Sequence, residues 1–463
     1  MEEKNSEKKE RKMRDSGIPW IGEVPEGWKI GKIKNCCTLI GSGTTPSSHI
    51  TEYYDNEKIN WIQSGDIYGK IKIFDVKTRI STKAVLNNQT LKIYKAPFIV
   101  MAMYGGSVGN TAISMIDACT NQACCCLKPD DDTDFMFLYY WVQFCKDNFL
   151  MKAEGGGQPN ISQEKIKNQY FCAPLITEQH RIADFLDSKC SEIDALIENL
   201  RARMESAKEY KKAIITEAVT KGLNKDAKMK DSVVEWIGEI PEGWKVCKVK
   251  QISNKITDGA HVSPDTTNGE FKFLSVTNMN DTGALDFVNC LKINSVQYAY
   301  LVRTGCQPKK DDVLISKDGT IGKTTVVSDN NFVVASSLVI IRPNQLKIRP
   351  KYLEYCLMSN IVQEQLLSVL SGSALKRVSI EKNANLKFVY TYDMTTQQQI
   401  IDYLDSKCSE IDALLQNYED QIATLEEYKK SLIYEYVTGK KEVPAALRYR
   451  NQKICPPKAG GLV

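Results

Sequence analysis

The sequence predicts a mixed α/β protein in which one unit occurs twice and each copy ends in a long helix. Three observations lead to this fold class. The chain has 463 residues, more than the roughly 250 to 300 at which a single core stops growing. Long stretches of sequence recur at a nearly constant spacing. Short apolar runs between turn residues come before a strong helical pattern in both copies. We therefore expect at least two domains.

The repeat is visible in two blocks of sequence. Residues 13–28 read MRDSGIPWIGEVPEGW and residues 229–244 read MKDSVVEWIGEIPEGW, with 11 of 16 positions identical. The second block, LDSKCSEIDAL, starts at Leu186 and again at Leu404. The two offsets, 216 and 218 residues, are so similar that one unit must have been used twice.

Between these blocks, each copy contains candidate strands, which are β-branched or apolar runs bounded by turn residues. They are residues 58–62, 96–102 and 123–127 in the first copy, and residues 271–276, 313–316 and 337–341 in the second. The order of the strands within a sheet is not predicted.

Each copy then ends in a helix whose apolar stripe repeats every 3.5 residues. The first stripe is Ile182, Leu186, Ile193, Leu196, Leu200, Ala207, Tyr210 and Ile214, and the second is Ile400, Leu404, Ile411, Leu414, Tyr418, Leu425, Tyr428 and Leu432. Polar residues interrupt both stripes at matching places, Lys189 with Lys407 and Arg203 with Gln421. A single stripe usually covers a core, but two matched stripes predict an antiparallel pair of helices that bury each other.

The composition excludes several classes of protein. With 42% hydrophobic and 25% charged residues the chain is globular, and its net charge of +4 argues neither for nor against a nucleic-acid partner. The sequence has no apolar run of about 18 residues and begins with a charged stretch, so we expect a cytoplasmic chain without membrane contact. Fifteen cysteines without a CxxC motif and three scattered histidines predict reduced thiols and no metal site.

Four motifs occur in both copies: WIGEVPEGW with WIGEIPEGW, the doubled LDSKCSEIDAL, EYKK at 209–212 and 427–430, and the turns GSVG at 106–109 and GTIG at 319–322. Together they resemble the specificity (S) subunit of type I restriction-modification systems, and the resemblance covers about residues 13–440. It implies two target recognition domains separated by two long antiparallel helices in a coiled-coil-like pair with pseudo-two-fold symmetry. The corresponding boundaries are 13–177 and 229–395 for the recognition domains, and 178–222 and 396–438 for the spacer helices. No role is predicted for the tail, 439–463.

The resemblance also implies partners. Each recognition domain would read one half of a split double-stranded DNA site, and the helices would set the spacing and dock two methyltransferase (M) subunits. Restriction (R) subunits would join the complex. No cofactor is expected on this chain, whereas S-adenosylmethionine, ATP and Mg²⁺ are expected on the partner subunits.

Candidate DNA contacts are polar residues on the loops of each copy, because base edges need paired donors and acceptors and phosphates need basic groups. Residues 245–393 carry 19 Lys and Arg against 13 Asp and Glu, and residues 29–177 carry 16 against 13. The candidates in the second copy are Lys317, Thr320, Lys323, Ser373, Lys376 and Arg377. Those in the first copy are Gln63, Ser64, Ser107, Asn110, Gln158 and Asn160. For each of them, the alternative is an ordinary solvated loop residue.

The candidate contacts with the M subunits are aromatic. Four are tryptophans of the leading segments, residues 13–28 and 229–244, and two are tyrosines on the helices: Trp20, Trp28, Trp236, Trp244, Tyr210 and Tyr428. For the tryptophans, packing of the leading segment onto its own module is the alternative.

No catalytic residues are predicted. Asp265, Glu270 and Lys272 mimic the letters of a PD…ExK nuclease site, but only four residues separate the two carboxylates. The sequence has no GxSxG elbow, no P-loop and no methyltransferase motif. We therefore expect a non-catalytic DNA-reading subunit. The remaining alternatives are a stand-alone DNA-binding regulator or scaffold and a metal-dependent nuclease.

Overall fold

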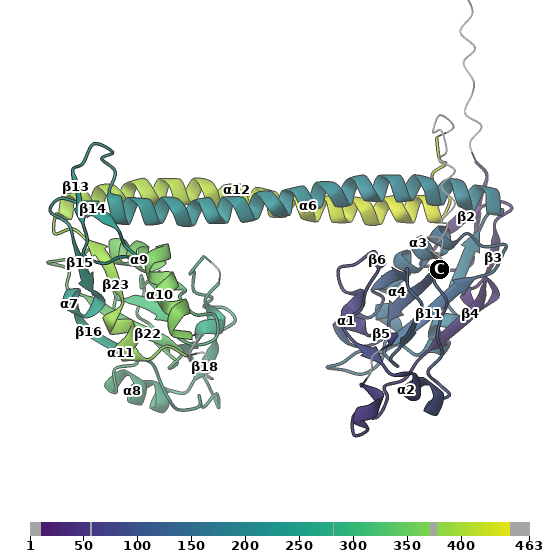
Figure 1. The fold of residues 1–463 in the computed structure, drawn as a ribbon, viewed down its shortest axis with the longest axis horizontal. Helices are drawn as coiled ribbons and strands as arrows, with labels where there is room; N and C mark the ends of the chain where they lie inside the picture. Colours follow the sequence, from purple (N-terminus) through teal and green to yellow (C-terminus); the bar gives the residue numbers. More distant parts are fainter. Residues whose placement is uncertain (1–10, 56–57, 281, 371–376, 445–463) are drawn as a thin grey trace, which may run out of the picture. The chain divides into compact units, whose positions relative to one another are not determined.

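The protein is described here from a computed structural model that covers residues 11–55, 58–280, 282–370 and 377–444. The chain divides into two compact units. Unit 1 consists of residues 1–199 and 421–463, and unit 2 of residues 200–420. The two long helices, α6 (Ile176–Lys221) and α12 (Met394–Val437), contribute residues to both units (Figure 1). Each unit therefore combines one α/β module with one end of each long helix. No helix within the described ranges is long and apolar enough to cross a membrane.

The module of unit 1 is built on a five-stranded sheet of order β4-β11-β8-β9-β6 and a three-stranded sheet of order β10-β5-β7. Two antiparallel ribbons, β1-β2 and β3-β12, join the module to the helices. The strands are β1 (Met13–Asp15), β2 (Glu23–Pro25), β3 (Lys29–Lys32), β4 (Cys37–Ser42), β5 (Ile59–Ile62), β6 (Lys72–Ile73), β7 (Arg79–Ile80), β8 (Phe98–Ala102), β9 (Thr111–Ser114), β10 (Ala118–Thr120), β11 (Cys124–Pro129) and β12 (Tyr170–Ala173). The helices are α1 (Ser64–Ile67), α2 (Thr82–Asn87), α3 (Phe135–Phe144), α4 (Lys146–Lys152) and α5 (Gln163–Lys167).

The module of unit 2 has a four-stranded sheet of order β16-β22-β19-β20 and a three-stranded sheet of order β18-β17-β21. Its ribbons are β13-β14 and β15-β23. The strands are β13 (Met229–Asp231), β14 (Glu239–Pro241), β15 (Lys245–Lys248), β16 (Ser253–Asp258), β17 (Phe271–Leu274), β18 (Leu291–Ile293), β19 (Val313–Ser316), β20 (Thr324–Val326), β21 (Phe332–Val334), β22 (Leu338–Pro343) and β23 (Lys387–Tyr390). The helices are α7 (Val249–Ile252), α8 (Ser295–Arg303), α9 (Pro350–Met358), α10 (Asn360–Leu370) and α11 (Ile380–Asn385).

The two modules share their strand order although their sequences have diverged, except that β6 extends the large sheet of unit 1. In unit 1, β11 pairs with β4 on one side and with β8, the strand before the glycine turn, on the other. In unit 2, β22 pairs in the same way with β16 and β19. In both, the small sheet contains one parallel pair, β5 with β10 and β17 with β21. All six predicted strands coincide with strands of these sheets. The prediction of a doubled α/β fold is confirmed.

Each long helix is anchored to its own module by a buried glutamine in its first turn. Gln179 is 2% exposed, and its amide nitrogen donates to the carbonyl oxygens of Asp132 and Pro174. Gln397, fully buried in α12, makes the equivalent bonds to Lys347 and Thr391. Because buried polar groups are costly when unpaired, these side chains fix where each helix leaves its module.

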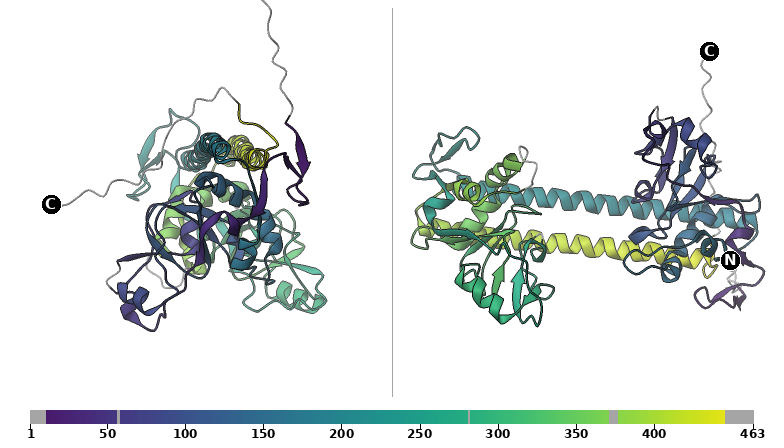
Figure 2. Two further views of the ribbon diagram at one scale, coloured as in Figure 1. Left: turned by 90° about the vertical axis from the view of Figure 1, so that its right-hand side faces the viewer. Right: turned by 90° about the horizontal axis from the view of Figure 1, so that it is seen from below.

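The helices pack against each other in each unit, and the views in Figure 2 show their segments side by side. In unit 1, Asp194 pairs with Lys429, and the ring of Phe185 lies 4.4 Å from that of Tyr436. Residue numbers therefore fall along α6 as they rise along α12, so the helices are antiparallel.

The seam between the helices differs from the predicted stripe at two of its eight positions in each helix, which are exposed. Leu186 is fully buried, as predicted, but Leu196 is 55% exposed and the neighbouring Ile197 is buried. Leu414 is likewise 41% exposed. The placement of Leu196 and Leu414 in the seam is wrong, because a heptad stripe has two possible flanks and the helices bury the flank that includes Ile197. Of the predicted interruptions, Arg203 and Gln421 are exposed, whereas Lys189 and Lys407 are half-buried.

Two lysines, Lys211 and Lys429, form ion pairs across the seam. The Lys211 ammonium lies 2.7 Å from both carboxylate oxygens of Asp412 in unit 2, and that of Lys429 lies 2.6 Å from both oxygens of Asp194 in unit 1. The four residues are two copies of one pair, since each Asp and each Lys recurs 218 positions later. Such pairs fix the register of antiparallel helices.

Candidate nucleic-acid interface

In unit 1, the two loops singled out from the sequence lie side by side. The 3-10 turn Gly105–Ser107 follows β8, and the backbone N–H of Gly105 donates to the carbonyl of Pro159 at 2.7 Å. The backbone N–H of Ile161 donates to the carbonyl of Met103 at 2.9 Å, and Tyr104 forms a β-bridge with Asn160. The turn and the loop that carries Gln158 and Asn160 thus form one surface.

Unit 2 brings the equivalent loops together in the same way. The backbone N–H of Val378 donates to the carbonyl of Lys317 at 3.0 Å, and Asp318 forms a β-bridge with Arg377. Lys317 directly follows β19, as Met103 directly follows β8. The internal repeat therefore places different side chains on one backbone framework.

The candidate residues of unit 1 at this surface are neutral, and Glu154, which forms a β-bridge with Asn160, adds a carboxylate beside them. Gln158 and Asn160 are exposed, and Asn110 is half-buried. The Ser107 hydroxyl donates to the carbonyl of Tyr104, whose ring is 44% exposed. Tyr104 was not predicted, because an aromatic residue after a buried strand is usually part of the core.

Gln63 and Ser64 belong to another loop of unit 1, at the start of α1. The Gln63 amide donates to the Thr78 hydroxyl at 3.2 Å, and its backbone N–H donates to Asp66. Both residues are half-buried. Gln63 therefore contributes to the local fold at this position.

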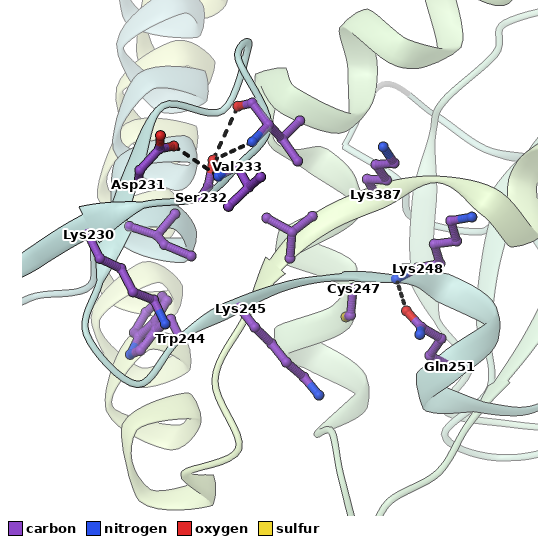
Figure 3. A pocket seen from close by; sticks show the side chains of 13 residues that line it. Lys230, Asp231, Ser232, Val233, Trp244, Lys245, Cys247, Lys248, Gln251 and Lys387 are labelled. Atoms are coloured by element: carbon purple, nitrogen blue, oxygen red, sulfur yellow. Dashed lines mark hydrogen bonds between the residues drawn. The ribbon is translucent and has the colours of Figure 1, made fainter.

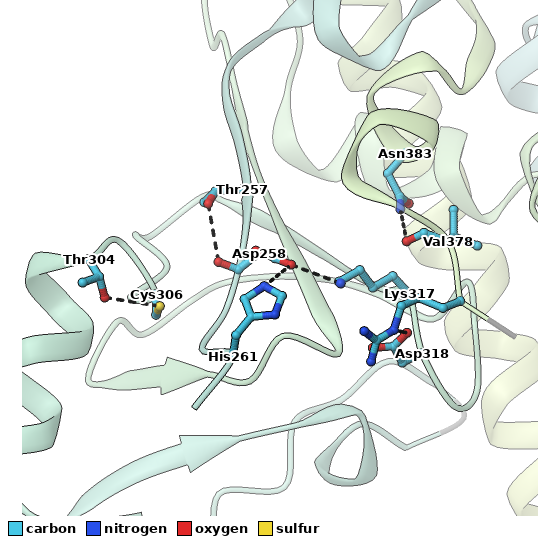
Figure 4. A network of polar contacts seen from close by, with 10 residues as sticks. Thr257, Asp258, His261, Thr304, Cys306, Lys317, Asp318, Val378 and Asn383 are labelled. Carbon is cyan, nitrogen blue, oxygen red and sulfur yellow. Dashed lines mark hydrogen bonds and ion pairs between the residues drawn. The ribbon is translucent and has the colours of Figure 1, made fainter. Parts of the chain in front are cut away.

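In unit 2, Lys317 does not point into solvent. Its side chain is 4% exposed, and its ammonium lies 3.1 Å from the Oδ2 atom of Asp258, which is 10% exposed. The same carboxylate atom lies 2.9 Å from Nε2 of the exposed His261 (Figure 4). A lysine held in this way is not available to a phosphate, so the candidate role of Lys317 as a DNA contact does not fit its position.

The other candidates of unit 2 differ in exposure. Thr320 is exposed at the tip of the turn, whereas the Lys323 ammonium donates to the carbonyl of Met279 at 2.9 Å. Arg377 is exposed, and its Nε donates to Asp318 at 2.7 Å. Ser373 and Lys376 lie outside the described residues.

Asp258, His261 and Asp318 were not predicted as site residues, because no sequence pattern marks them. Each is a polar residue in a loop or at a strand end. Asp258 is 59 residues from Lys317 and Asp318 is 59 residues from Arg377, whereas His261 is only three residues from Asp258. Only the pairing of β16 with β22 and of β22 with β19 brings Asp258 beside Lys317.

Two of the four candidate tryptophans are core residues. Trp28 is 3% exposed, with its ring 6.3 Å from that of Phe137. Trp244 is 8% exposed and packs on Gly222 at the end of α6, where an added Cβ would approach the indole to 3.3 Å. Trp20 is half-buried, whereas Trp236 is 47% exposed. Trp28 and Trp244 therefore stabilise their own units, and only Trp236 presents a large surface to a partner.

Comparisons with known proteins agree with this architecture. A model of the family described as type I restriction modification DNA specificity domain matches residues 25–206 and 241–424. The chain belongs to this family. Its doubled sequence accounts for the two matched ranges, each of which runs from a leading segment into a long helix.

Individual members of the specificity-subunit family match most of the chain. The type I restriction enzyme MjaIX specificity subunit of Methanocaldococcus jannaschii is 25% identical over 440 residues, which cover 91% of this chain and 95% of that protein. The EcoBI specificity subunit of Escherichia coli is 22% identical over 346 residues, covering 73% and 72%. A chain solved in work on assembly and conformational transition of the type I R-M system is similar in fold, with a TM-score of 0.62, 15% identity, and coverage of 90% and 99%.

The tyrosines of the EYKK motifs lie on the outer surface of the helices in this specificity-subunit chain. Tyr210 is 59% exposed and Tyr428 is 54% exposed, and each directly precedes the lysine of an interhelix ion pair. Their placement in the seam is wrong for the reason given for Leu196. Their exposure fits the second role predicted for them, contact with a partner.

A basic groove of about 580 Å³ lies between the leading segment and the β15-β23 ribbon of unit 2 (Figure 3). Its basic lining residues are Lys230, Lys245, Lys248 and Lys387. Lys248 and Lys387 are register partners on adjacent strands, so their charges lie close together. Burial raises the pKa of the Cys247 thiol in the groove wall to about 12, which keeps that thiol neutral.

The nuclease-like residues of unit 2 are spread over a loop and a strand, since Asp265 lies in the loop before β17 and Lys272 lies in β17. The Asp265 carboxylate accepts hydrogen bonds from the backbone N–H of Thr267 and the amide of Asn294, and these bonds lower the pKa of Asp265. Across the described ranges, no group of three or more His, Cys, Asp or Glu side chains could hold a metal ion.

Proposed function

We propose that the two modules of this specificity subunit read the two different halves of a split, asymmetric double-stranded DNA site. The observation that carries this proposal is the pair of equivalent loop surfaces. One backbone framework presents Tyr104 and Asn160 in unit 1 but Asp318 and Arg377 in unit 2. Because base identity is read by the donors and acceptors of side chains, different side chains on equivalent loops would select different base pairs.

We further propose that the paired helices are the element that sets the gap between the half-sites. The duplicated ion pairs and buried seam support this role, since they fix the register of α6 against α12 in each unit. Two readers of adjacent major grooves on one face of B-DNA need a separation of about 34 Å. A helix pair of fixed register can hold such a spacing constant.

The repeated exposed residues are our candidates for docking the two M subunits. Tyr210 and Tyr428 have the same surroundings in two places, so they suit a partner that binds twice. The exposed Trp236 is a further candidate. We place the R subunits in the same complex, in the cytoplasm with the DNA, by family resemblance.

We infer that this chain supplies recognition and assembly, while catalysis belongs to its partners. S-adenosylmethionine would act on the M subunits, and ATP and Mg²⁺ on the R subunits. The proposal is supported by the relatives, which are specificity subunits of type I restriction enzymes.

The test is methylome sequencing of cells that express the chain with its M subunit. We expect a split, asymmetric methylated motif that is absent when either protein is omitted. The purified chain alone should not cut DNA in the presence of Mg²⁺. Methylation without the chain would contradict the proposal, as would a continuous motif, and cutting by the isolated chain would support a nuclease instead.

A further inference from the structure

The ion pair between Arg377 and Asp318 presents an arginine in the form suited to reading a guanine. The contact uses Nε of the guanidinium, at 2.7 Å from Oδ1 of Asp318. It therefore leaves the terminal nitrogens Nη1 and Nη2 outside this ion pair. The Arg377 side chain is 57% exposed, whereas that of Asp318 is 17% exposed. The carboxylate is thus a largely buried support beneath an exposed guanidinium.

The support is itself rigidly held. The next residue along the chain, Lys317, is buried with its ammonium against Asp258 (Figure 4). The backbone of Lys317 also donates to Ser337 and accepts from Val378, the residue after Arg377. Breaking a buried ion pair leaves an uncompensated charge, so the backbone at this point resists movement. Arg377 is therefore held through its side chain and through the neighbouring backbone.

We propose that Arg377 reads a guanine in the half-site of unit 2, with Asp318 as the positioning residue. The inference rests on the proposed function. An arginine fork donates two parallel hydrogen bonds to O6 and N7 of guanine, and no other base offers two acceptors at that edge of the major groove. A fork that is already oriented loses less side-chain freedom on binding, which favours a base contact over a diffuse phosphate contact.

The other unit provides an internal comparison. Asn160 of unit 1 occupies the position of Arg377, with Tyr104 in the place of Asp318. Unit 1 thus has a tyrosine where unit 2 has Asp318 and an asparagine where unit 2 has Arg377, so the guanine reader is a property of unit 2. Asn160→Ala is therefore the comparison variant: it should affect the half-site of unit 1 and leave the G·C preference of the unit 2 half-site unchanged.

The experiment compares the methylomes of cells that carry the complete complex with wild-type chain, Arg377→Ala, Arg377→Lys, Asp318→Asn or Asn160→Ala. In the wild type, one half-site should contain a G·C pair that is preferred by about 5- to 150-fold over other pairs, the range of one good bidentate contact. Both Arg377→Ala and Arg377→Lys should abolish this preference, since lysine keeps the charge but not the fork. Asp318→Asn should weaken it at the same base pair.

Several results would overturn the inference. One is an unchanged motif in Arg377→Ala. Another is a wild-type motif in Arg377→Lys, which would indicate a phosphate contact. The third is loss of the same G·C preference in Asn160→Ala. Binding of each purified complex to a nonspecific duplex checks that the variants assemble. Failure of the wild-type complex to methylate any split motif would instead contradict the proposed function.

Discussion

Replacing Leu186 by alanine should destabilise unit 1 far more than replacing Leu196, although both leucines belong to the same repeated segment. Both residues lie on α6. Leu186 is fully buried in the core of unit 1, whereas Leu196 is 55% exposed. Deleting a buried leucine side chain costs about 2.7 to 5 kcal/mol, from lost apolar transfer and the cavity that remains. At an exposed helix position the same change costs less than about 0.5 kcal/mol, because alanine is also a strong helix former.

The assay is thermal unfolding of the purified chain, followed by tryptophan fluorescence. For a unit of this size, Leu186→Ala should lower the transition temperature of unit 1 by about 5 to 20 °C. Leu196→Ala should shift it by no more than about 2 °C. The second copy provides a repeat of the experiment, since Leu404 is fully buried and Leu414 is 41% exposed. Equal losses for the two leucines of one copy would refute the seam described here.

Three further predictions concern an ion pair between the helices, the buried glutamine of α6 and the two exposed tyrosines. A double-mutant cycle on Asp194 and Lys429 should give a coupling energy of about 0.5 to 2 kcal/mol by urea unfolding, because the pair is partly buried, and no measurable coupling would contradict the ion pair. Gln179→Ala should lower the free energy of unfolding by about 1 to 3 kcal/mol in the same assay, because it leaves two buried backbone carbonyls unpaired. A change near zero would show that water replaces the amide. The double variant Tyr210→Ala with Tyr428→Ala should weaken copurification of the M subunit at least tenfold without a change in transition temperature, and unaltered copurification would place the docking surface elsewhere.

Much of the fold could be predicted because alignment of the two copies of the repeat reveals the duplicated unit. Residues 13–28 and 229–244 align only if one unit is used twice, and apolar runs such as 313–316 have no stable alternative to a buried strand. The phase of the helical seam could not be predicted, because Leu196 and Ile197 are equally apolar and only the partner helix decides which is buried.

The candidate site was predicted at the level of loops but not of side chains. The candidate residues were placed on loops, but the contact between the glycine turns and the second loops in both units was not predicted. Lys317, however, has a buried carboxylate partner in Asp258, which pairing of β16, β22 and β19 brings near. A sequence shows that a lysine adjoins a turn, but not whether its charge is already neutralised. Trp28 and Trp244 show the same difficulty, because the sequence does not distinguish a tryptophan that contacts a partner from one that is buried in the core.

The most direct test of the account replaces the module of unit 2, residues 245–393, with a second copy of residues 29–175 from unit 1. If each unit reads its own half-site, the complex of this chain with its M subunit should methylate a split motif made of two identical halves in inverted order, with the gap of the wild-type motif. A motif that keeps the asymmetric wild-type sequence, or that changes in both halves, would contradict the claim that each module reads one half of the site.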